Sequence, residues 1–198
     1  MAQDPVPTRD RIIAAAARLF YAEGIRAVSV DAVAERAGIT KKTLYYHFRS
    51  KDDLVEAYLQ SRDQPALDAY AAWFERAEGD VAERIRTMFR EFAQSADTDR
   101  WRGCGFLRTI AELANMPGHP AVKAGAAHKK RFEAWLTDIF DQNGLQEPAS
   151  VARRIVILLD GAATVMLIHR DVAYVEVAGD VAAELVSRAV RKGREVSV

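Results

Sequence analysis

The sequence predicts an all-α protein, and three observations lead to this prediction. Apolar residues recur at helical spacing along most of the chain, and alanine, leucine, glutamate and arginine are abundant. No segment alternates between apolar and polar residues as a half-buried strand does. About half of the 198 residues are apolar and 28% are charged, which is typical of globular domains.

The first 50 residues predict three helices. We expect the first from about Arg9 to Glu23, with Thr8 as its N-cap and Gly24 at its end. Two short helices follow at residues 30–37 and 41–47. Ser50 and Asp53 have the spacing of a capping box, which predicts the start of a fourth helix.

Longer helices are expected in the rest of the chain, near residues 66–78, 80–95, 104–115, 120–142, 148–170 and 177–193. Pro65 either begins a new helix in its first turn or ends the preceding one. The layout predicts a small helical domain at residues 1–55 and a larger helical domain at residues 56–198.

The segment from Val30 to Phe48 has the pattern of a helix-turn-helix. Ala34 is small, as it must be where two helices cross closely. Gly38 occupies the tight turn, where a positive φ costs glycine least. Leu44 is apolar and anchors the second helix to the core. These three positions predict the geometry in which a second helix enters the major groove of DNA.

The exposed side of that second helix carries polar and basic side chains. Lysine can donate to guanine O6 and N7, and threonine can contact a base edge. Tyrosine and histidine reach phosphates, and Lys51 begins the next helix, where a phosphate is favoured. Residues 1–51 also contain nine Lys and Arg against five Asp and Glu, a net charge of +4. We therefore predict that this segment binds DNA.

The residues from Thr40 to Leu54, Thr-Lys-Lys-Thr-Leu-Tyr-Tyr-His-Phe-Arg-Ser-Lys-Asp-Asp-Leu, resemble the TetR/AcrR family of repressors. Residues 12–20 and Gly24 add to the resemblance, which covers about residues 9–60. It implies an N-terminal three-helix DNA-binding domain and a C-terminal domain for ligand binding and dimerisation. It also implies that a bound ligand changes the spacing of the two DNA-binding heads and releases the operator.

The resemblance assigns the DNA contacts to individual residues. Ser29 matches a position that contacts the DNA backbone, and Lys51 matches a phosphate contact. Asp31 stands where some members carry a basic residue that reads a base, so we expect that contact to be absent. The predicted DNA-binding residues are Ser29, Thr40, Lys41, Lys42, Thr43, Tyr45, Tyr46, His47 and Lys51.

A helical effector domain needs a mostly apolar cavity with a few polar anchors. Aromatic and sulfur-containing residues are frequent after residue 70, and polar residues of the same region are candidate anchors. The predicted pocket residues are Trp73, Phe89, Phe92, Phe106, Arg108, Glu112, His128, Trp135, Met166 and His169.

The last two helices, near 148–170 and 177–193, predict the interface of a homodimer. The first is apolar on nearly all sides, and the second carries an apolar stripe. We expect two helices from each protomer to meet in a four-helix bundle. A twofold dimer also suits a pseudo-palindromic operator, since one recognition helix reads few base pairs.

Other classes of protein are disfavoured. The sequence has no phosphate loop, nucleophile elbow or metal-ligand spacing, so we expect no enzymatic activity, cofactor or metal. The single cysteine, Cys104, excludes an intrachain disulfide and is expected to be a small buried residue rather than a redox sensor. The first ten residues lack the apolar core of a signal peptide, and the most apolar stretch, 155–168, is too short to span a membrane. We expect a cytoplasmic protein.

The sequence therefore predicts a ligand-responsive repressor that a small molecule releases from a pseudo-palindromic operator. The sequence leaves open an alternative in which a protein of the same fold uses DNA as a scaffold for another protein without acting as a local repressor.

Overall fold

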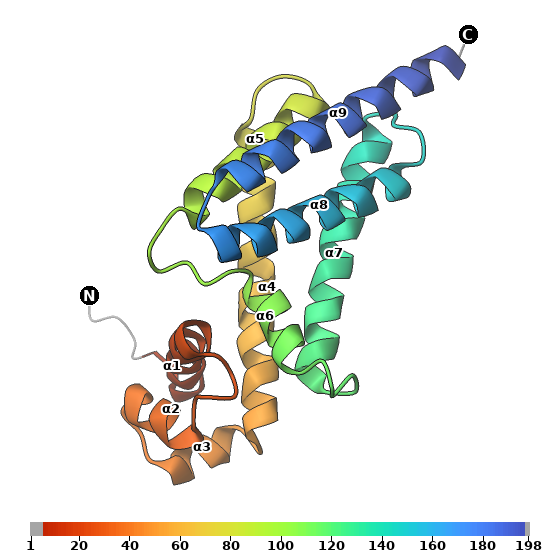
Figure 1. The fold of residues 1–198 in the computed structure, drawn as a ribbon. Coiled ribbons are helices and arrows are strands. Elements are labelled where there is room, and N and C mark those ends of the chain that lie inside the picture. The colour runs from red at the N-terminus through yellow and green to blue at the C-terminus, as the bar shows by residue number, and fades with distance from the viewer. Residues whose placement is uncertain (1–5, 197–198) are drawn as a thin grey trace, which may run out of the picture. The chain divides into compact units, whose positions relative to one another are not determined.

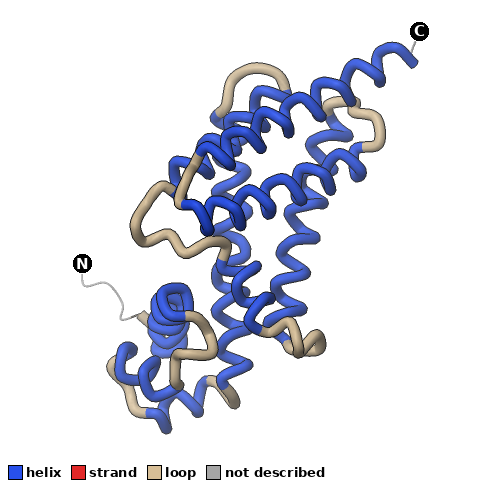
Figure 2. The backbone as a smooth tube through the Cα atoms, in the orientation of Figure 1, coloured by secondary structure: helices blue, strands red, loops and turns tan. Residues whose placement is uncertain are grey.

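A computed structural model describes residues 6–196 of the chain. This part of the chain forms nine α-helices joined by loops and contains no strand (Figures 1 and 2). The prediction of an all-α fold is confirmed. No helix within the described residues is both long and apolar enough to cross a membrane.

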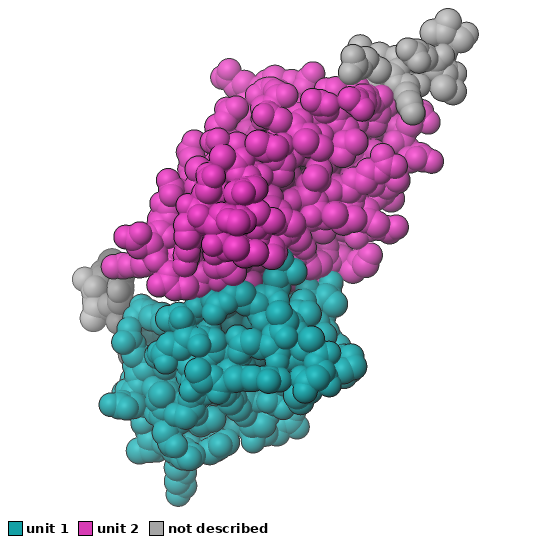
Figure 3. All heavy atoms as spheres, in the orientation of Figure 1, with its two compact units in different colours: residues 1–64, 105–126 teal, residues 65–104, 127–198 magenta. Residues whose placement is uncertain are grey.

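The helices group into two compact units (Figure 3). The first consists of the described part of residues 1–64 together with residues 105–126, and the second of residues 65–104 with the described part of 127–198. This division differs from the domain boundary after residue 55 that the sequence predicts. Residues distant in sequence from the helix-turn-helix, at 105–126, therefore fold with it.

The first unit contains α1 (Thr8–Glu23), α2 (Val30–Ala37), α3 (Lys41–His47) and the first half of α4 (Lys51–Arg76). It also contains α6 (Gly105–Glu112) and the start of α7 (Pro120–Gln142). The two short helices have the predicted bounds. Apolar side chains from these helices form the core, among them Ile12, Phe20, Val33, Leu44, Phe48 and Leu54.

The predicted N-cap of α1 is wrong. Thr8 is the first helical residue, and Pro7 takes the non-helical position before it without a side-chain cap. The carbonyl of Pro7 accepts hydrogen bonds from the backbone N–H groups of Asp10 and Arg11, at 3.0 and 3.1 Å. The preset φ of proline makes it suitable at this boundary.

The break or restart predicted at Pro65 is also wrong, because α4 continues through it. Pro65 lacks an N–H, so one hydrogen bond of the helix is missing there. Buried side chains hold the helix on both sides of the proline, with Leu59 in the core of the first unit and Phe74 in that of the second. Tertiary packing thus outweighs the local preference.

The second unit contains the rest of α4 and α7 together with α5 (Val81–Ala96), α8 (Pro148–His169) and α9 (Ala173–Val196). α9 packs against both α5 and α8. At Gly179 of α9 a Cβ would lie 2.8 Å from the Cβ of Phe89, so only glycine allows α5 to approach this closely. The core between these helices is formed by apolar side chains, including Ile85, Phe89, Leu136, Ile155, Leu159 and Val186.

Candidate nucleic-acid interface

Local caps fix the turn between α2 and α3. Ser29 is the N-cap of α2, and its Oγ accepts from the backbone N–H of Ala32 at 3.1 Å. Gly38 has φ 66° and ends the helix in the left-handed conformation, with its N–H directed to the carbonyls of Ala34 and Glu35. Ala34 is buried. The residues singled out for a helix-turn-helix therefore adopt its geometry.

Thr40 begins α3 as its N-cap. Its Oγ1 accepts from the backbone N–H of Thr43 at 3.1 Å, and the two threonine hydroxyls lie 2.9 Å apart. Leu44 is fully buried, and Phe48 is the C-cap of the helix. The guanidinium of Arg9 lies over the Phe48 ring, 5.1 Å from its centroid. One face of α3 is thus fixed to the core.

The opposite face of α3 is open to solvent. Lys41, Lys42, Tyr45 and Tyr46 are exposed, and 86% of the surface of Tyr46 is accessible. The rings of Tyr46 and His47 meet edge to face with centroids 5.2 Å apart. An exposed tyrosine pair among lysines is unusual for a solvated surface but suits contact with phosphates and base edges.

Asp31 forms a contact that sequence reasoning missed. Its Oδ2 accepts a hydrogen bond from Nζ of Lys41 at 2.9 Å, and this ion pair joins α2 to the start of α3. The hydrogen bond to Asp31 raises the pKa of Lys41. Both residues occupy the first turns of their helices, which is the signal in the sequence that could have indicated the pair.

Lys51 lies in the first turn of α4, next to Ser50, whose Oγ accepts from the backbone N–H of Asp53 at 3.0 Å. Partial burial lowers the pKa of Lys51, and the carboxylates of Glu112 and Asp52 oppose this shift. The predicted phosphate contact is therefore only partly exposed.

Three predicted pocket residues lie on α6 in the first unit, where two of them bond to the end of α1 and to the loop that follows it. Phe106 is buried there. Nη1 of Arg108 donates to the carbonyl of Tyr21 at 2.7 Å, and the Glu112 carboxylate accepts from the backbone N–H of Arg26 at 3.0 Å. α6 thus holds the turn that leads from α1 to α2.

Three other predicted pocket residues belong to an aromatic cluster in the second unit. Tyr70, which sequence reasoning missed, lies with its ring centroid 5.3 Å from Trp73, 6.2 Å from Phe92 and 4.7 Å from Phe132. Trp135 stacks on Phe132 at 5.7 Å. Burial raises the pKa of the Tyr70 phenol. The spacing of Tyr70 and Trp73, three residues apart on one helix, could have indicated this cluster.

His128 is buried in the second unit beside an ion pair. Burial lowers its pKa to about 4, and the ammonium of Lys129 adds to the shift. The Lys129 side chain is paired with Asp160 of α8. Phe89, also predicted to line a pocket, is fully buried in the α5–α9 contact.

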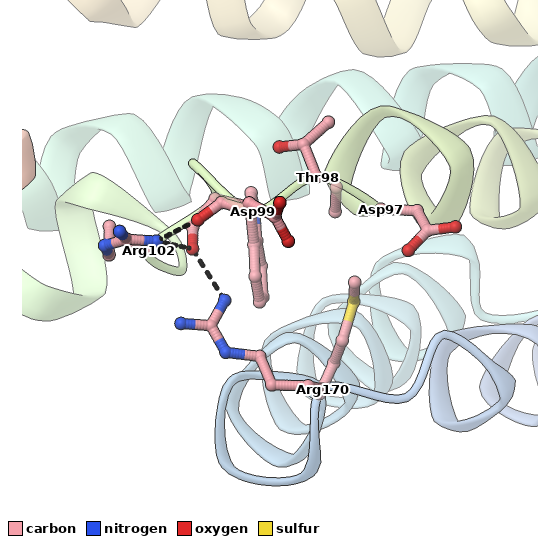
Figure 4. Close-up of a pocket in the computed structure, with 8 residues that line it drawn as sticks. Asp97, Thr98, Asp99, Arg102 and Arg170 are labelled. Carbon is pink, nitrogen blue, oxygen red and sulfur yellow. Dashed lines mark hydrogen bonds between the residues drawn. The ribbon is translucent and has the colours of Figure 1, made fainter.

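A pocket of about 350 Å³ lies in the second unit between the segment after α5 and the end of α8 (Figure 4). Arg170 donates to the carbonyl of Trp101 at 2.8 Å, and Arg102 bonds the carbonyls of Asp99 and Trp101. The lining residues are Ala96, Asp97, Thr98, Asp99, Trp101, Arg102, Met166 and Arg170. Of the predicted pocket residues, only Met166 lines it.

The last predicted pocket residue, His169, is exposed at the end of α8 and stacks on Tyr174, with centroids 5.1 Å apart. Within the second unit, the predicted pocket residues are therefore spread over the aromatic cluster, the α5–α9 contact, the pocket beside Met166 and the end of α8. Within residues 6–196, no group of three or more His, Cys, Asp and Glu is arranged to hold a metal ion.

α8 and α9 expose several large apolar side chains. Ile157 and Ile168 project from α8, and 68% of the surface of Ile168 is accessible. Tyr174, Val177 and Val181 are exposed on α9. On each helix these residues recur at intervals of three, four or eleven, so each set lies along one helical face. The described residues of the chain thus leave two apolar faces uncovered.

Comparisons of the sequence with known proteins find relatives of the N-terminal part of the chain, which belongs to the first unit. A family model described as bacterial regulatory proteins, tetR family, matches residues 12–58. SrpR of Pseudomonas putida is 41% identical over 58 residues, which are 29% of this chain and 27% of SrpR. TtgW, also of Pseudomonas putida, is 41% identical over 58 residues, which are 29% of this chain and 43% of TtgW. The matches thus span less than half of these relatives.

A comparison of whole structures extends the likeness. The crystal structure of SCO4454, a TetR-family transcriptional regulator from Streptomyces coelicolor, is 30% identical and superposes with a TM-score of 0.76. The likeness covers 94% of this chain and 95% of SCO4454. The chain belongs to the TetR family. The TetR family model ends at residue 58 and does not include α5, α8 or α9. For these helices the likeness to the family comes from the superposition on SCO4454, which covers 94% of the chain.

Proposed function

We propose that this protein is a DNA-binding transcriptional repressor that acts as a homodimer and leaves its operator when a small molecule binds. The exposed face of α3 carries the proposal, because lysines and tyrosines stand on a capped helix whose other face is anchored by Leu44. In a helix-turn-helix this face enters the major groove. Lys41, Lys42 and Thr43 are the proposed base readers, and Tyr46, His47 and Lys51 the proposed phosphate contacts.

The apolar faces of α8 and α9 support a second copy of the chain as the partner. Ile157, Ile168 and Val177 have no polar atoms in their side chains, so a phosphate or a base edge is a poor partner for them. Two antiparallel helices from each protomer can bury such faces in a four-helix bundle. A dimer places two copies of α3 on two half-sites, as a pseudo-palindromic operator requires.

The second unit supports binding of a small molecule. Its pocket of about 350 Å³ combines an aromatic wall, Trp101, with carboxylates and guanidinium groups. The segment that lines it, from Asp97 to Arg102, runs directly into α6, whose Arg108 and Glu112 hold the end of α1. A ligand that orders or shifts this segment acts on α6 through the continuous chain.

DNA binding is tested by selecting fragments from a genomic library with the purified protein and measuring affinity by fluorescence anisotropy over a range of salt concentrations. We expect a pseudo-palindromic site and an affinity that falls steeply with salt, because phosphate contacts release counterions. Equal affinity for all fragments would contradict the proposal. The number and position of genomic sites also separate a local repressor from a DNA-bound scaffold. One or two sites near the protein's own gene would support a local repressor, and many dispersed sites would argue against it.

Ligand response is tested by a thermal-shift screen of small molecules, with each hit assayed for release of the selected DNA. We expect Trp101→Ala to abolish the response to a hit while leaving DNA affinity unchanged. Phe140→Leu, a conservative change at a buried position outside the pocket, is the control and keeps the response. Hits that stabilise the protein without releasing DNA would contradict the effector role.

A further inference from the structure

Asp31 places an acidic group on the surface that is proposed to face DNA. Its side chain is 65% exposed, and it lies in the first turn of α2, directly beside Lys41 at the start of α3. A carboxylate near the phosphate backbone weakens binding to every DNA sequence. An acid at this position therefore requires a compensating contact if the surface binds DNA.

The ion pair with Lys41 gives little stability to the fold. Both side chains are more than half exposed, and exposed ion pairs contribute little to stability because water and salt screen them. The hydrogen bond uses only Oδ2 of Asp31 and one of the three ammonium protons of Lys41. The pair therefore presents a donor and an acceptor side by side, 2.9 Å apart, with capacity left on both.

A G·C base pair offers the complementary pattern in the major groove. Guanine O6 is an acceptor, the amino group on cytosine N4 is a donor, and the hydrogen bond that joins them is itself about 2.9 Å long. Lysine to guanine and aspartate to cytosine are both favourable pairings, and here one ion pair supplies both groups.

We propose that Asp31 and Lys41 act together as one reader of a G·C base pair in each half-site, with the ammonium donating to guanine O6 and the carboxylate accepting from cytosine N4. This inference rests on the proposed DNA-binding function and adds a base identity to it. Asp31 is then a specificity-determining residue, although it is acidic where some members of the family carry a basic residue that reads a base.

An A·T pair also places a donor beside an acceptor, so the choice of G·C needs a further reason. Beyond guanine O6 lies N7, a second acceptor that the same ammonium can reach. Beyond thymine O4 lies the C5 methyl group, which offers no acceptor and occupies the space of the lysine head.

The pairing makes an unusual prediction about charge. Removing an acid from a DNA-binding surface raises affinity for unrelated DNA, since repulsion from phosphates disappears. If Asp31 also reads cytosine, the same substitution lowers the preference for the selected site. Affinity and specificity then move in opposite directions, which loss of a purely structural contact does not explain.

The experiment selects sites from a randomised pool of double-stranded DNA with the full chain and with the variants Asp31→Ala, Asp31→Asn and Lys41→Ala. Affinities for the selected site and its single-base variants are then measured by anisotropy. We expect Asp31→Ala and Lys41→Ala to relax the same G·C position, with a loss of preference of roughly tenfold. We expect Asp31→Asn to shift that position towards A·T, because asparagine pairs with adenine N6 and N7.

Glu35→Ala is the matched control, because Glu35 is an exposed acid on the same helix and its removal changes the net charge equally. It is expected to leave every base preference unchanged, and thermal melting checks that all variants fold. If the parent protein selects a motif but Asp31→Ala relaxes no position, or a different one from Lys41→Ala, the paired reader is wrong and DNA binding stands. If the parent protein selects no motif at all, the proposed function itself fails and the inference with it.

Discussion

In the first unit the exposed face of α3 carries polar side chains above a buried aliphatic one, whereas the second unit exposes aliphatic side chains on α8 and α9 and buries a histidine. On α3 the exposed groups are ammonium ions and phenols above a buried Leu44. In the second unit Ile168 and Val177 are exposed, while His128 is buried beside the pair formed by Lys129 and Asp160. Exposed polar tips suit nucleic acid, and exposed aliphatic side chains suit another protein surface. The comparison supports the proposal that the first unit binds DNA and the second unit binds another protein surface.

The largest expected effect comes from placing a charge on the apolar face of α8. In Ile168→Glu the lost burial of isoleucine counts twice across a twofold interface, roughly 4 kcal/mol, which weakens the dimer by about a thousandfold. Sedimentation velocity at micromolar concentration should show a monomer, and operator affinity should fall with it. Met116→Glu, at an exposed apolar residue outside α8 and α9, is the control and stays dimeric. A dimeric Ile168→Glu protein would contradict the proposal that this face of α8 forms the dimer interface.

The sequence predicted the helix-turn-helix of the first unit well because its signals are local. Caps, turn and anchor lie within 20 residues, so Ser29, Gly38 and Leu44 identify the helix-turn-helix without knowledge of distant packing. The ion pair of Asp31 with Lys41 was missed because it depends on how two helices meet, although both lie within that segment.

The second unit was predicted only in outline. The helices of the C-terminal part were expected, but which side of α8 is exposed depends on contacts with residues far along the chain. Met166 is buried and Ile168 exposed, although both are apolar and two residues apart. The same limit applies within the first unit, where Arg108 and Glu112 of α6 were expected to line a pocket. Their hydrogen-bond partners are residues 21 and 26, more than 80 positions earlier. Sequence spacing does not encode such pairings.

The buried polar group of the second unit gives a smaller effect that depends on pH. In the folded state the pKa of His128 is lowered to about 4 from its ordinary value of 6.5. Between these values the unfolded chain binds more protons at this histidine. The contribution of His128 to stability is therefore constant above pH 6.5 and falls as the pH decreases towards 4. The expected loss is about 3 kcal/mol.

Urea unfolding at a series of pH values measures this loss, and His128→Gln should flatten the profile over the same range even if its stability at pH 7 is lower. The three other histidines are present in both proteins, so the difference between the two profiles isolates His128. If the two proteins gave parallel profiles of stability against pH, His128 would take up a proton equally well in the folded and unfolded states. The second unit would then not bury this histidine in an uncharged form.

Loss of a phosphate contact on the first unit should cost less. Tyr46→Ala and Lys51→Ala each remove one contact per half-site, roughly 1 kcal/mol for each half-site, and weaken binding to all sequences alike. Anisotropy titrations over a range of salt concentrations should also show a shallower salt dependence for Lys51→Ala, because a charged contact is lost, but not for Tyr46→Ala. The control is Lys123→Ala, an exposed lysine of the same unit outside the motif, which should change neither quantity. A change of base preference in Tyr46→Ala would make this tyrosine a base reader.

The smallest effect concerns the cap that holds α3 in place. Thr40→Val keeps the shape of the side chain but removes the acceptor of the Thr43 backbone N–H, which should cost about 1 kcal/mol. Thr40→Ser retains the acceptor and should restore stability, so the pair of variants separates the hydroxyl from the methyl group. Hydrogen exchange of the α3 amides measures the effect directly: in Thr40→Val we expect faster exchange in α3 and unchanged exchange in α8. Because the same cap orients Lys41 and Lys42, DNA affinity should fall in step with the loss of protection. Faster exchange without weaker binding would mean that DNA itself orders the start of α3. Lys41 and Lys42 would then take their binding positions only when the protein is bound to the operator.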